Sequence, residues 1–174
     1  RTKRVASETG ATVVAPDAIY SVRADIFAPC AMGGIINDDT IPLLKVEIVA
    51  GGANNQLLEP RHGDILEQRG LLYTPDYVAN AGGVINVYGE VAGWSPERAL
   101  KKADEIYDTV LGVFEIAKSE GIPSYEAADR LAERRLASAP TKPAPRSQSA
   151  VRPTPAVSSA VSDIESFSAG SSRS

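Results

Sequence analysis

Short apolar runs alternate with helical stretches over the first part of the chain, and this alternation limits the folds that the chain can adopt. The runs are Ala11–Ala15, Asp25–Ala28, Val46–Ala50 and Leu71–Tyr73. Residues 37–44 and 59–69 between them have the composition of short helices, and Gly70 stands where a left-handed residue ends a helix. Strands separated by helices are typical of a parallel sheet with crossover connections. The alternation therefore predicts an α/β fold.

A long amphipathic helix is predicted after residue 95. Ser95 is a favourable N-cap, Pro96 suits the first helical position, and Gly121 ends the helix. Apolar residues recur in it at three- and four-residue steps: Leu100, Ala103, Ile106, Tyr107, Val110, Leu111, Phe114 and Ala117. We expect Ser124 to cap a last helix that runs through Leu136.

The composition changes near residue 138, where Ser, Ala, Pro, Thr and Arg become dominant. Such a segment has too little apolar surface to offset the entropy lost on ordering, so residues 138–174 are predicted to be disordered. A docking role for this tail is the alternative.

Composition and charge exclude several classes of function. The 174 residues carry a formal net charge of −4, which argues against a nucleic-acid binder, and the chain has no apolar run long enough to span a membrane. A single cysteine, Cys30, fits a reducing, cytoplasmic compartment. With only one histidine, His62, beside it, we predict no metal site.

Three loops rich in glycine or asparagine stand at the carboxyl ends of the predicted strands. They span residues 28–34, 50–56 and 80–86. Ligands of open parallel sheets bind at this edge, glycine allows a close approach of the backbone, and asparagine can both donate and accept hydrogen bonds. The three loops are therefore predicted to surround one small-molecule cleft.

Longer ordered stretches around these loops resemble the leucine/phenylalanine/valine dehydrogenases, which are relatives of glutamate dehydrogenase. The stretches are Ile48–Leu57, Tyr73–Val87, Glu105–Thr109 and Ala127–Glu133, together with Ala28–Ala31 and the following Asn37–Asp38. The resemblance covers roughly residues 5 to 137 and is strongest toward leucine dehydrogenases.

The resemblance implies an activity and a cofactor. Members of this family oxidatively deaminate branched-chain or aromatic L-amino acids to 2-oxo acids and ammonia, with NAD as the hydride acceptor. The implied substrate is leucine, with valine and phenylalanine as alternatives. We expect the full-length protein to form a homo-oligomer.

The resemblance also implies how the chain is organised. Residues 1–95 correspond to the C-terminal part of a Rossmann-like NAD-binding domain. Residues 96–137 correspond to closing helices that pack toward an N-terminal catalytic domain, and residues 138–174 form the tail.

The cofactor positions follow from the resemblance residue by residue. Cys30, Ala31 and Met32 match a loop along the ribose on the nicotinamide side of the cofactor. Asn54 and Asn55 match amides near the nicotinamide and the substrate. A tight turn is the alternative interpretation of the two asparagines.

The substrate pocket is carried over in the same way onto Asn55, Asn80, Val84 and Val87. Two valines three residues apart share one face of a helix start and would form an apolar wall. Glutamate-specific relatives have a small polar residue at the second valine position, so Val87 argues against glutamate. Core packing of the valines is the alternative.

The family's catalytic lysine segment, its partner aspartate and the phosphate-binding G-x-G-x-x-G motif do not occur in these 174 residues. We therefore predict no catalytic residue here and no turnover by this chain alone. A dinucleotide-binding module without activity is the alternative function.

Four other residues have a structural interpretation beside a functional one. Cys30 is expected to be a small packed residue rather than a reactive thiol, and His62 a surface or capping residue. Tyr88 and Trp94 are expected to pack one helix on another, with substrate contact as the alternative.

Overall fold

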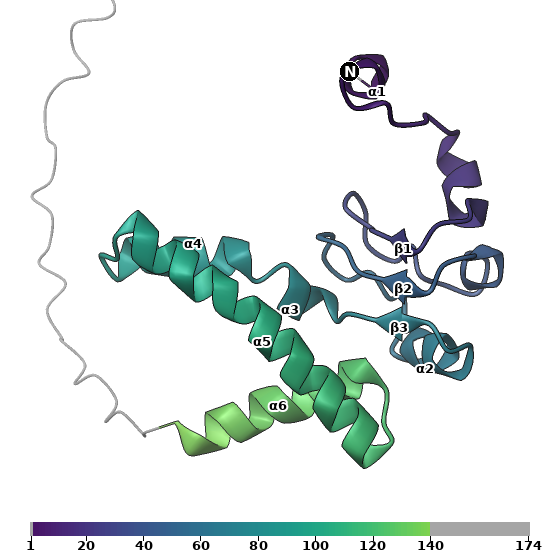
Figure 1. The fold of residues 1–174 in the computed structure, drawn as a ribbon. Helices are drawn as coiled ribbons and strands as arrows, with labels where there is room; N and C mark the ends of the chain where they lie inside the picture. The colour runs from purple at the N-terminus through teal and green to yellow at the C-terminus, as the bar shows by residue number, and fades with distance from the viewer. Residues whose placement is uncertain (1, 140–174) are drawn as a thin grey trace, which may run out of the picture. The chain divides into compact units, whose positions relative to one another are not determined.

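The computed structural model describes residues 2–139, so the predicted tail falls almost entirely outside the described part. Its elements in chain order are α1 (Thr2–Thr9), η1 (Pro16–Ser21), β1 (Ile26–Phe27), η2 (Ile41–Leu43), β2 (Ile48–Val49), α2 (Arg61–Gln68), β3 (Leu72–Tyr73), α3 (Asp76–Ala79), α4 (Gly82–Val91), α5 (Pro96–Glu120) and α6 (Ser124–Ser138) (Figure 1).

The three strands form a small parallel sheet in the order β1-β2-β3. Phe27, Val49 and Tyr73 lie in register on one face, and that face is the one the fold buries. α2 follows β2 and returns the chain to β3, as a crossover connection must. The predicted parallel α/β arrangement is therefore present.

The core beneath the sheet is apolar. It consists of Ile36, Ile41, Leu44, Val49, Leu66, Leu71 and Tyr73. Most of these residues come from the strands and from the connections between them. The parallel register of the three strands places their carboxyl ends side by side.

The prediction of a strand at residues 11–15 is wrong, because this run lies outside the helices and strands and precedes η1. Val13 is 51% exposed, so the run has no neighbouring strand on which to bury its side chains. A β-type sequence without a partner strand does not form a strand on its own.

The helix predicted over residues 37–44 is reduced to the short η2. Asn37 forms a turn instead, in which its Oδ1 accepts from the backbone N–H groups of Asp39 and Thr40. Asparagine competes with helix formation through such local bonds.

Both ends of the long helix lie where the sequence predicts them. Ser95 precedes α5 and its hydroxyl accepts from the Arg98 backbone N–H at 3.3 Å. Gly121 follows it with a φ of 65°, in the left-handed region that favours glycine.

The packed face of α5 differs from the predicted stripe. Val113 is fully buried against Ala127 and Ala128 of α6, whereas Leu100 and Tyr107 of the predicted stripe are about 70% exposed. α5 crosses α6 around this small second core (Figure 1).

Ser124 does not act as the N-cap of α6. It is the first residue of the helix, and its buried hydroxyl donates to the Tyr73 carbonyl at 2.6 Å. Tyr77 makes a second link, with its hydroxyl 2.6 Å from Asp129 Oδ1. Both bonds attach α6 to the segment that leaves β3.

None of the helices within residues 2–139 combines the length and the apolar composition needed to cross a membrane.

Candidate functional site

The loops that follow β1 and β2 are in direct backbone contact. The Ala53 N–H donates to the Pro29 carbonyl at 2.8 Å, and the Gly34 N–H donates to the Asn55 carbonyl at 2.7 Å. A Cβ atom on Gly51 would clash with the Pro29 backbone. Glycine is expected to let the backbone approach a ligand closely. Here it lets the two loops approach each other.

Asn55 sits in the left-handed region with a φ of 52°, a conformation that asparagine tolerates better than most residues. A Cβ on Gly33 would lie 2.7 Å from the Asn54 carbonyl oxygen. The Asn54-Asn55 pair therefore lies in a bend of the backbone, and both residues are exposed.

The structure brings two of the predicted site residues together. Asn80 Nδ2, at the end of α3, donates to Asn54 Oδ1 at 2.5 Å. This bond joins the loop after β2 to the loop after β3. It leaves the amide NH₂ group of Asn54 and the amide oxygen of Asn80 without a partner among residues 2–139.

A buried glutamine lies behind this pair. Gln56 is fully buried, and its Nε2 donates to the Gly51 carbonyl at 2.8 Å and to the Ala53 carbonyl at 3.0 Å. Its backbone N–H lies 3.4 Å from Asp76 Oδ2. In the sequence, the only signal for this role of Gln56 is its place directly after the asparagines.

Asp76 connects this loop to β3. Its other carboxylate oxygen faces the Tyr73 hydroxyl at 3.5 Å. Burial, and then the nearby Asp76 charge, raise the pKa of the Tyr73 hydroxyl well above its ordinary value. Tyr73 therefore stays neutral and can donate to the carboxylate.

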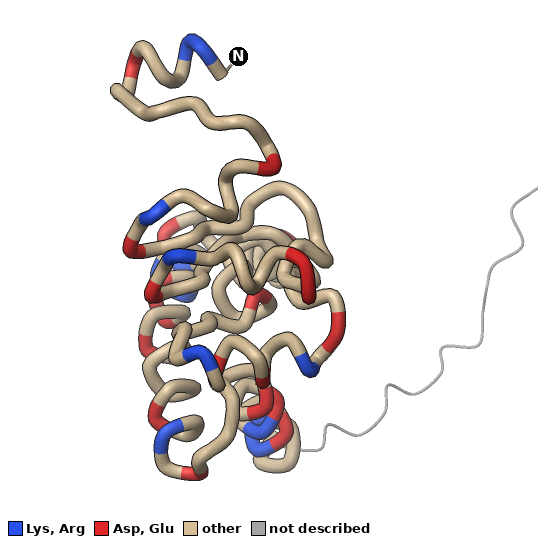
Figure 2. The backbone as a smooth tube through the Cα atoms, turned by 90° about the vertical axis from the view of Figure 1, so that its right-hand side faces the viewer, with Lys and Arg blue, Asp and Glu red and all other residues tan. Residues whose placement is uncertain are grey.

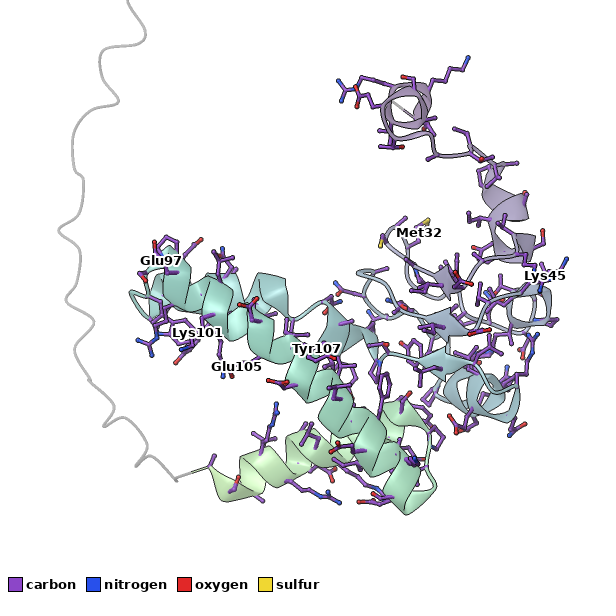
Figure 3. All side chains as sticks on the ribbon, viewed as in Figure 1. Met32, Lys45, Glu97, Lys101, Glu105 and Tyr107 are labelled. Atoms are coloured by element: carbon purple, nitrogen blue, oxygen red, sulfur yellow. The ribbon has the colours of Figure 1, made fainter. Side chains whose placement is uncertain are left out.

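The predicted ribose loop is open to solvent. Ala31 is exposed and Met32 is 71% exposed. Figure 3 shows Met32 on the loop that follows β1, at the opposite end of the sheet from Lys45. The expectation that Cys30 is packed is wrong: it is exposed, with Sγ 3.5 Å from the Gly52 nitrogen, because it follows the strand into the open loop.

Val84 and Val87 lie on one side of α4, as their spacing predicts, but 73% and 61% of their surface is exposed. α4 lies beyond α3, away from the sheet (Figure 1). The described residues therefore do not enclose an apolar pocket around these valines, and core packing does not explain them.

Tyr88 and Trp94 contact each other edge to face, with ring centroids 5.2 Å apart. Arg98 lies over the Trp94 ring at 4.4 Å. This cluster joins α4 to the start of α5, in agreement with the packing role.

The residues that directly follow β1 and β2 carry no charge, although the Asp76 carboxylate lies against the second of these loops. Residues 26–37 and 48–58 contain no charged side chain, while acidic and basic positions are interspersed along the rest of the described backbone (Figure 2). Just beyond these stretches, Arg61 pairs with both carboxylate oxygens of Asp38. The pKa of the Asp38 carboxyl falls to about 2, chiefly through its hydrogen bond with Arg61.

His62 is fully buried rather than on the surface, and it does not cap α2, which has no side-chain hydrogen bond at its N-cap. Its Nδ1 accepts from the Glu59 backbone N–H at 3.0 Å, at the start of α2. Within residues 2–139, no three potential metal ligands are grouped closely enough to hold a metal ion.

A groove of about 750 Å³ lies among the helices that follow β3. It is formed by residues of α3, α4, α5 and α6, among them Tyr77, Ile85, Ile106 and Leu131. None of the predicted site residues lines it.

Comparison with known proteins places this geometry in a family. A sequence profile described as Glutamate/Leucine/Phenylalanine/Valine dehydrogenase matches residues 2–142. The chain belongs to this family. The predicted resemblance is thereby confirmed, and the match lies on the N-terminal part of this chain.

Its relatives include a leucine dehydrogenase from Thermoactinomyces intermedius, 62% identical over 133 residues, which are 76% of this chain and 36% of the relative. An L-tryptophan dehydrogenase from Nostoc punctiforme is 57% identical over 128 residues, which are 73% of this chain and 36% of that protein.

A crystal structure of L-tryptophan dehydrogenase from Nostoc punctiforme superimposes with a TM-score of 0.76 at 54% identity. The match covers 78% of this chain and 40% of that structure. The chain thus spans little more than a third of the length of the curated dehydrogenases that it matches.

Proposed function

We propose that this chain supplies the cofactor-binding wall of an NAD-dependent amino acid dehydrogenase. Its whole protein would oxidatively deaminate a branched-chain L-amino acid, with leucine as the first choice and valine or phenylalanine as alternatives. The observation that carries the proposal is the Asn54–Asn80 amide pair, held at the carboxyl ends of β2 and β3 in a member of this dehydrogenase family.

The residues at this edge fit a dinucleotide. The free amide donor of Asn54 and the free amide oxygen of Asn80 match a carboxamide or a sugar hydroxyl, and no charge within residues 48–58 opposes a phosphate. Cys30, Ala31 and Met32 would contact the ribose from the other loop. NAD, when bound, supplies the hydride acceptor for the substrate α-carbon.

The substrate side of the proposal rests on α4. The exposed faces of Val84 and Val87 would form an apolar wall against an aliphatic side chain, and Asn55 and Asn80 would lie toward its polar end. An apolar wall disfavours the carboxylate of glutamate, because burying an unpaired charge is costly. A single methylene changes selectivity by only about 1–3 kcal/mol, so the apolar wall alone does not decide between leucine, valine and phenylalanine.

The organisation of the whole protein belongs to the same proposal. Residues 1–95 would form the C-terminal part of a Rossmann-like domain, and residues 96–137 would form helices that close toward a catalytic domain. The catalytic lysines would come from outside these 174 residues. We also propose that the protein is cytoplasmic and forms a homo-oligomer. The single cysteine supports the compartment but has no bearing on the oligomeric state.

A chimera tests the proposal. Residues 2–137 would replace the matching stretch of the Thermoactinomyces intermedius leucine dehydrogenase, and NADH absorbance would be followed with leucine, valine, phenylalanine, tryptophan and glutamate. We expect turnover that is fastest with leucine and negligible with glutamate. The 174-residue chain alone should show none.

Two results would contradict this proposal in different ways. A folded chimera that binds NADH without turning over any of the five amino acids would favour a dinucleotide-binding module without activity. A folded chimera that does not bind NADH would exclude the cofactor role of the edge.

A further inference from the structure

We propose that Gln56 is a positioning residue that fixes the conformation of the loop at residues 50–56 and thereby aims its asparagines at the cofactor. The role in cofactor binding rests on the proposed function. The role in fixing the loop rests on the geometry of this chain alone.

The Gln56 carboxamide acts as a clamp from inside the loop. Its two Nε2 hydrogens are used on the carbonyls of Gly51 and Ala53, at 2.8 and 3.0 Å. The side chain is fully buried, so water does not compete for these carbonyls. Two peptide groups of the loop are thereby held with their oxygens facing inward.

The orientation of those carbonyls determines where the loop presents its donors. In a trans peptide the C=O and the following N–H point in opposite directions. With the carbonyls of Gly51 and Ala53 facing Gln56, the N–H groups of Gly52 and Asn54 face away from it. The Gly52 N–H lies 3.5 Å from Cys30 Sγ, and the Asn54 N–H has no acceptor among residues 2–139.

Glutamine is held at this position despite a cost. Its Oε1 is buried and has no partner among the described residues. A buried polar atom without a partner destabilises a fold, so space filling alone would favour an apolar side chain. The two donors explain a carboxamide here, because methionine, glutamate and leucine lack the NH₂ group that both bonds require.

Asp76 fixes the same loop from its other end. Its carboxylate lies 3.4 Å from the Gln56 backbone nitrogen and also faces the Tyr73 hydroxyl. The side chain of Gln56 therefore holds the first half of the loop, while its backbone is attached to the segment after β3. A variant at the Gln56 side chain would therefore loosen the loop and its bonds to the loop after β1, while the Gln56 backbone keeps its contact with Asp76.

The test uses Gln56→Met in the full 174-residue chain, since methionine keeps the length and apolar volume and loses both donors. Leu66→Ala is the matched control: Leu66 is also fully buried, but it is part of α2 and packs into the apolar core. Backbone hydrogen exchange is measured for Ala53 and Gly34, whose N–H groups bond between the loops, and for Thr74, whose N–H bonds within the sheet.

We expect Gln56→Met to accelerate exchange at Ala53 and Gly34 by about tenfold more than at Thr74, which corresponds to the loss of an anchoring bond. Leu66→Ala should accelerate all three together, because it lowers only the global stability. Uniform acceleration in Gln56→Met, or none, would overturn the positioning role.

NADH binding, followed by its fluorescence, tests the link to function. If the unmodified chain binds NADH, Gln56→Met should raise the Kd by about tenfold while Leu66→Ala leaves it unchanged at a temperature where both are folded. Equal Kd values for Gln56→Met and the unmodified chain would overturn the link. If the unmodified chain binds no NADH, the same comparison is made in the chimera. A folded chimera that does not bind NADH would overturn the cofactor proposal, and the exchange experiment would still decide the role of Gln56.

Discussion

The loop after β2 and the helix α4 are both predicted to contact ligand, yet the chain supports them very differently. The loop is held by the buried carboxamide of Gln56, by backbone bonds to the loop after β1 and by the carboxylate of Asp76. In α4, Val84 and Val87 have more than half of their surface exposed. One wall is organised from within, and the other is an uncovered helix face.

This difference separates the two parts of the proposed site. A cofactor wall that is already ordered loses little entropy when a ligand binds, so it can act within the described residues. An apolar wall gains its energy from being removed from water, which requires a second surface. The described residues do not supply this second surface for Val84 and Val87.

The largest effect is expected from Gly51→Ala, which disturbs the organised wall directly. A Cβ there would clash with the Pro29 backbone, so one loop must move away from the other. We expect a loss of about 3 kcal/mol in the free energy of unfolding, which is typical of severe overpacking. Urea denaturation measures it.

Gly112→Ala is the matched control for this change. Gly112 lies within α5 and nothing is within 4 Å of the added Cβ, so the higher helix propensity of alanine should stabilise the chain by about 1 kcal/mol. If both variants were destabilised equally, the contact between the loops would not be what matters at Gly51.

The second effect concerns the link between the sheet and the last helices. Ser124→Ala removes the buried hydroxyl that donates to the Tyr73 carbonyl. Leaving that carbonyl without its partner should cost about 2 kcal/mol. Ser119→Ala removes a similar bond to a backbone carbonyl, but at an exposed site, and should leave the urea midpoint unchanged. Equal midpoints for both variants would contradict this.

The features that the sequence predicts well are local ones. The N-cap at Ser95 and the left-handed Gly121 depend on neighbours within a few residues, and both ends of α5 are found where they were expected. The pairing of Asn54 with Asn80, in contrast, joins two loops that are far apart in the sequence. It follows from topology, because parallel strands bring their carboxyl ends to one edge.

What the sequence does not predict depends on tertiary partners. Ser124 is a favourable N-cap by type, but α6 already begins at Ser124, and its hydroxyl donates to the Tyr73 carbonyl of β3. Val113 is central to the second core because α6 crosses α5 there, and the spacing of apolar residues alone does not give the crossing point. Gln56 is polar and buried, a combination that becomes visible only once the loop carbonyls around it are placed.

A smaller effect should appear as a change in the pH dependence of stability. Arg61 holds the pKa of Asp38 at about 2, against an ordinary value of 3.8. Because the pKa is lowered in the folded state, its contribution to stability is present above about pH 4 and is lost as the pH falls toward 2.

Asp38→Asn should therefore flatten the decline of the melting temperature between pH 4 and pH 2, mainly at low salt, since the pair is exposed and salt screens it. Asp39→Asn is the matched control, because Asp39 has no ion-pair partner among residues 2–139. An equal flattening in both variants would show that Arg61 is not the cause.

The smallest effect on stability is expected at the uncovered wall. Valine and serine have similar helix propensities, so Val87→Ser and Val84→Ser mainly test whether these side chains are buried by the chain itself. We expect the free energy of unfolding to change by less than about 0.5 kcal/mol, as at other exposed positions. In the chimera with leucine dehydrogenase, Val87→Ser should lower kcat/KM for leucine by about tenfold, because the pocket then loses apolar contact. A loss of stability in the chain alone would mean that α4 is already covered, and the contrast with the loop after β2 would then disappear.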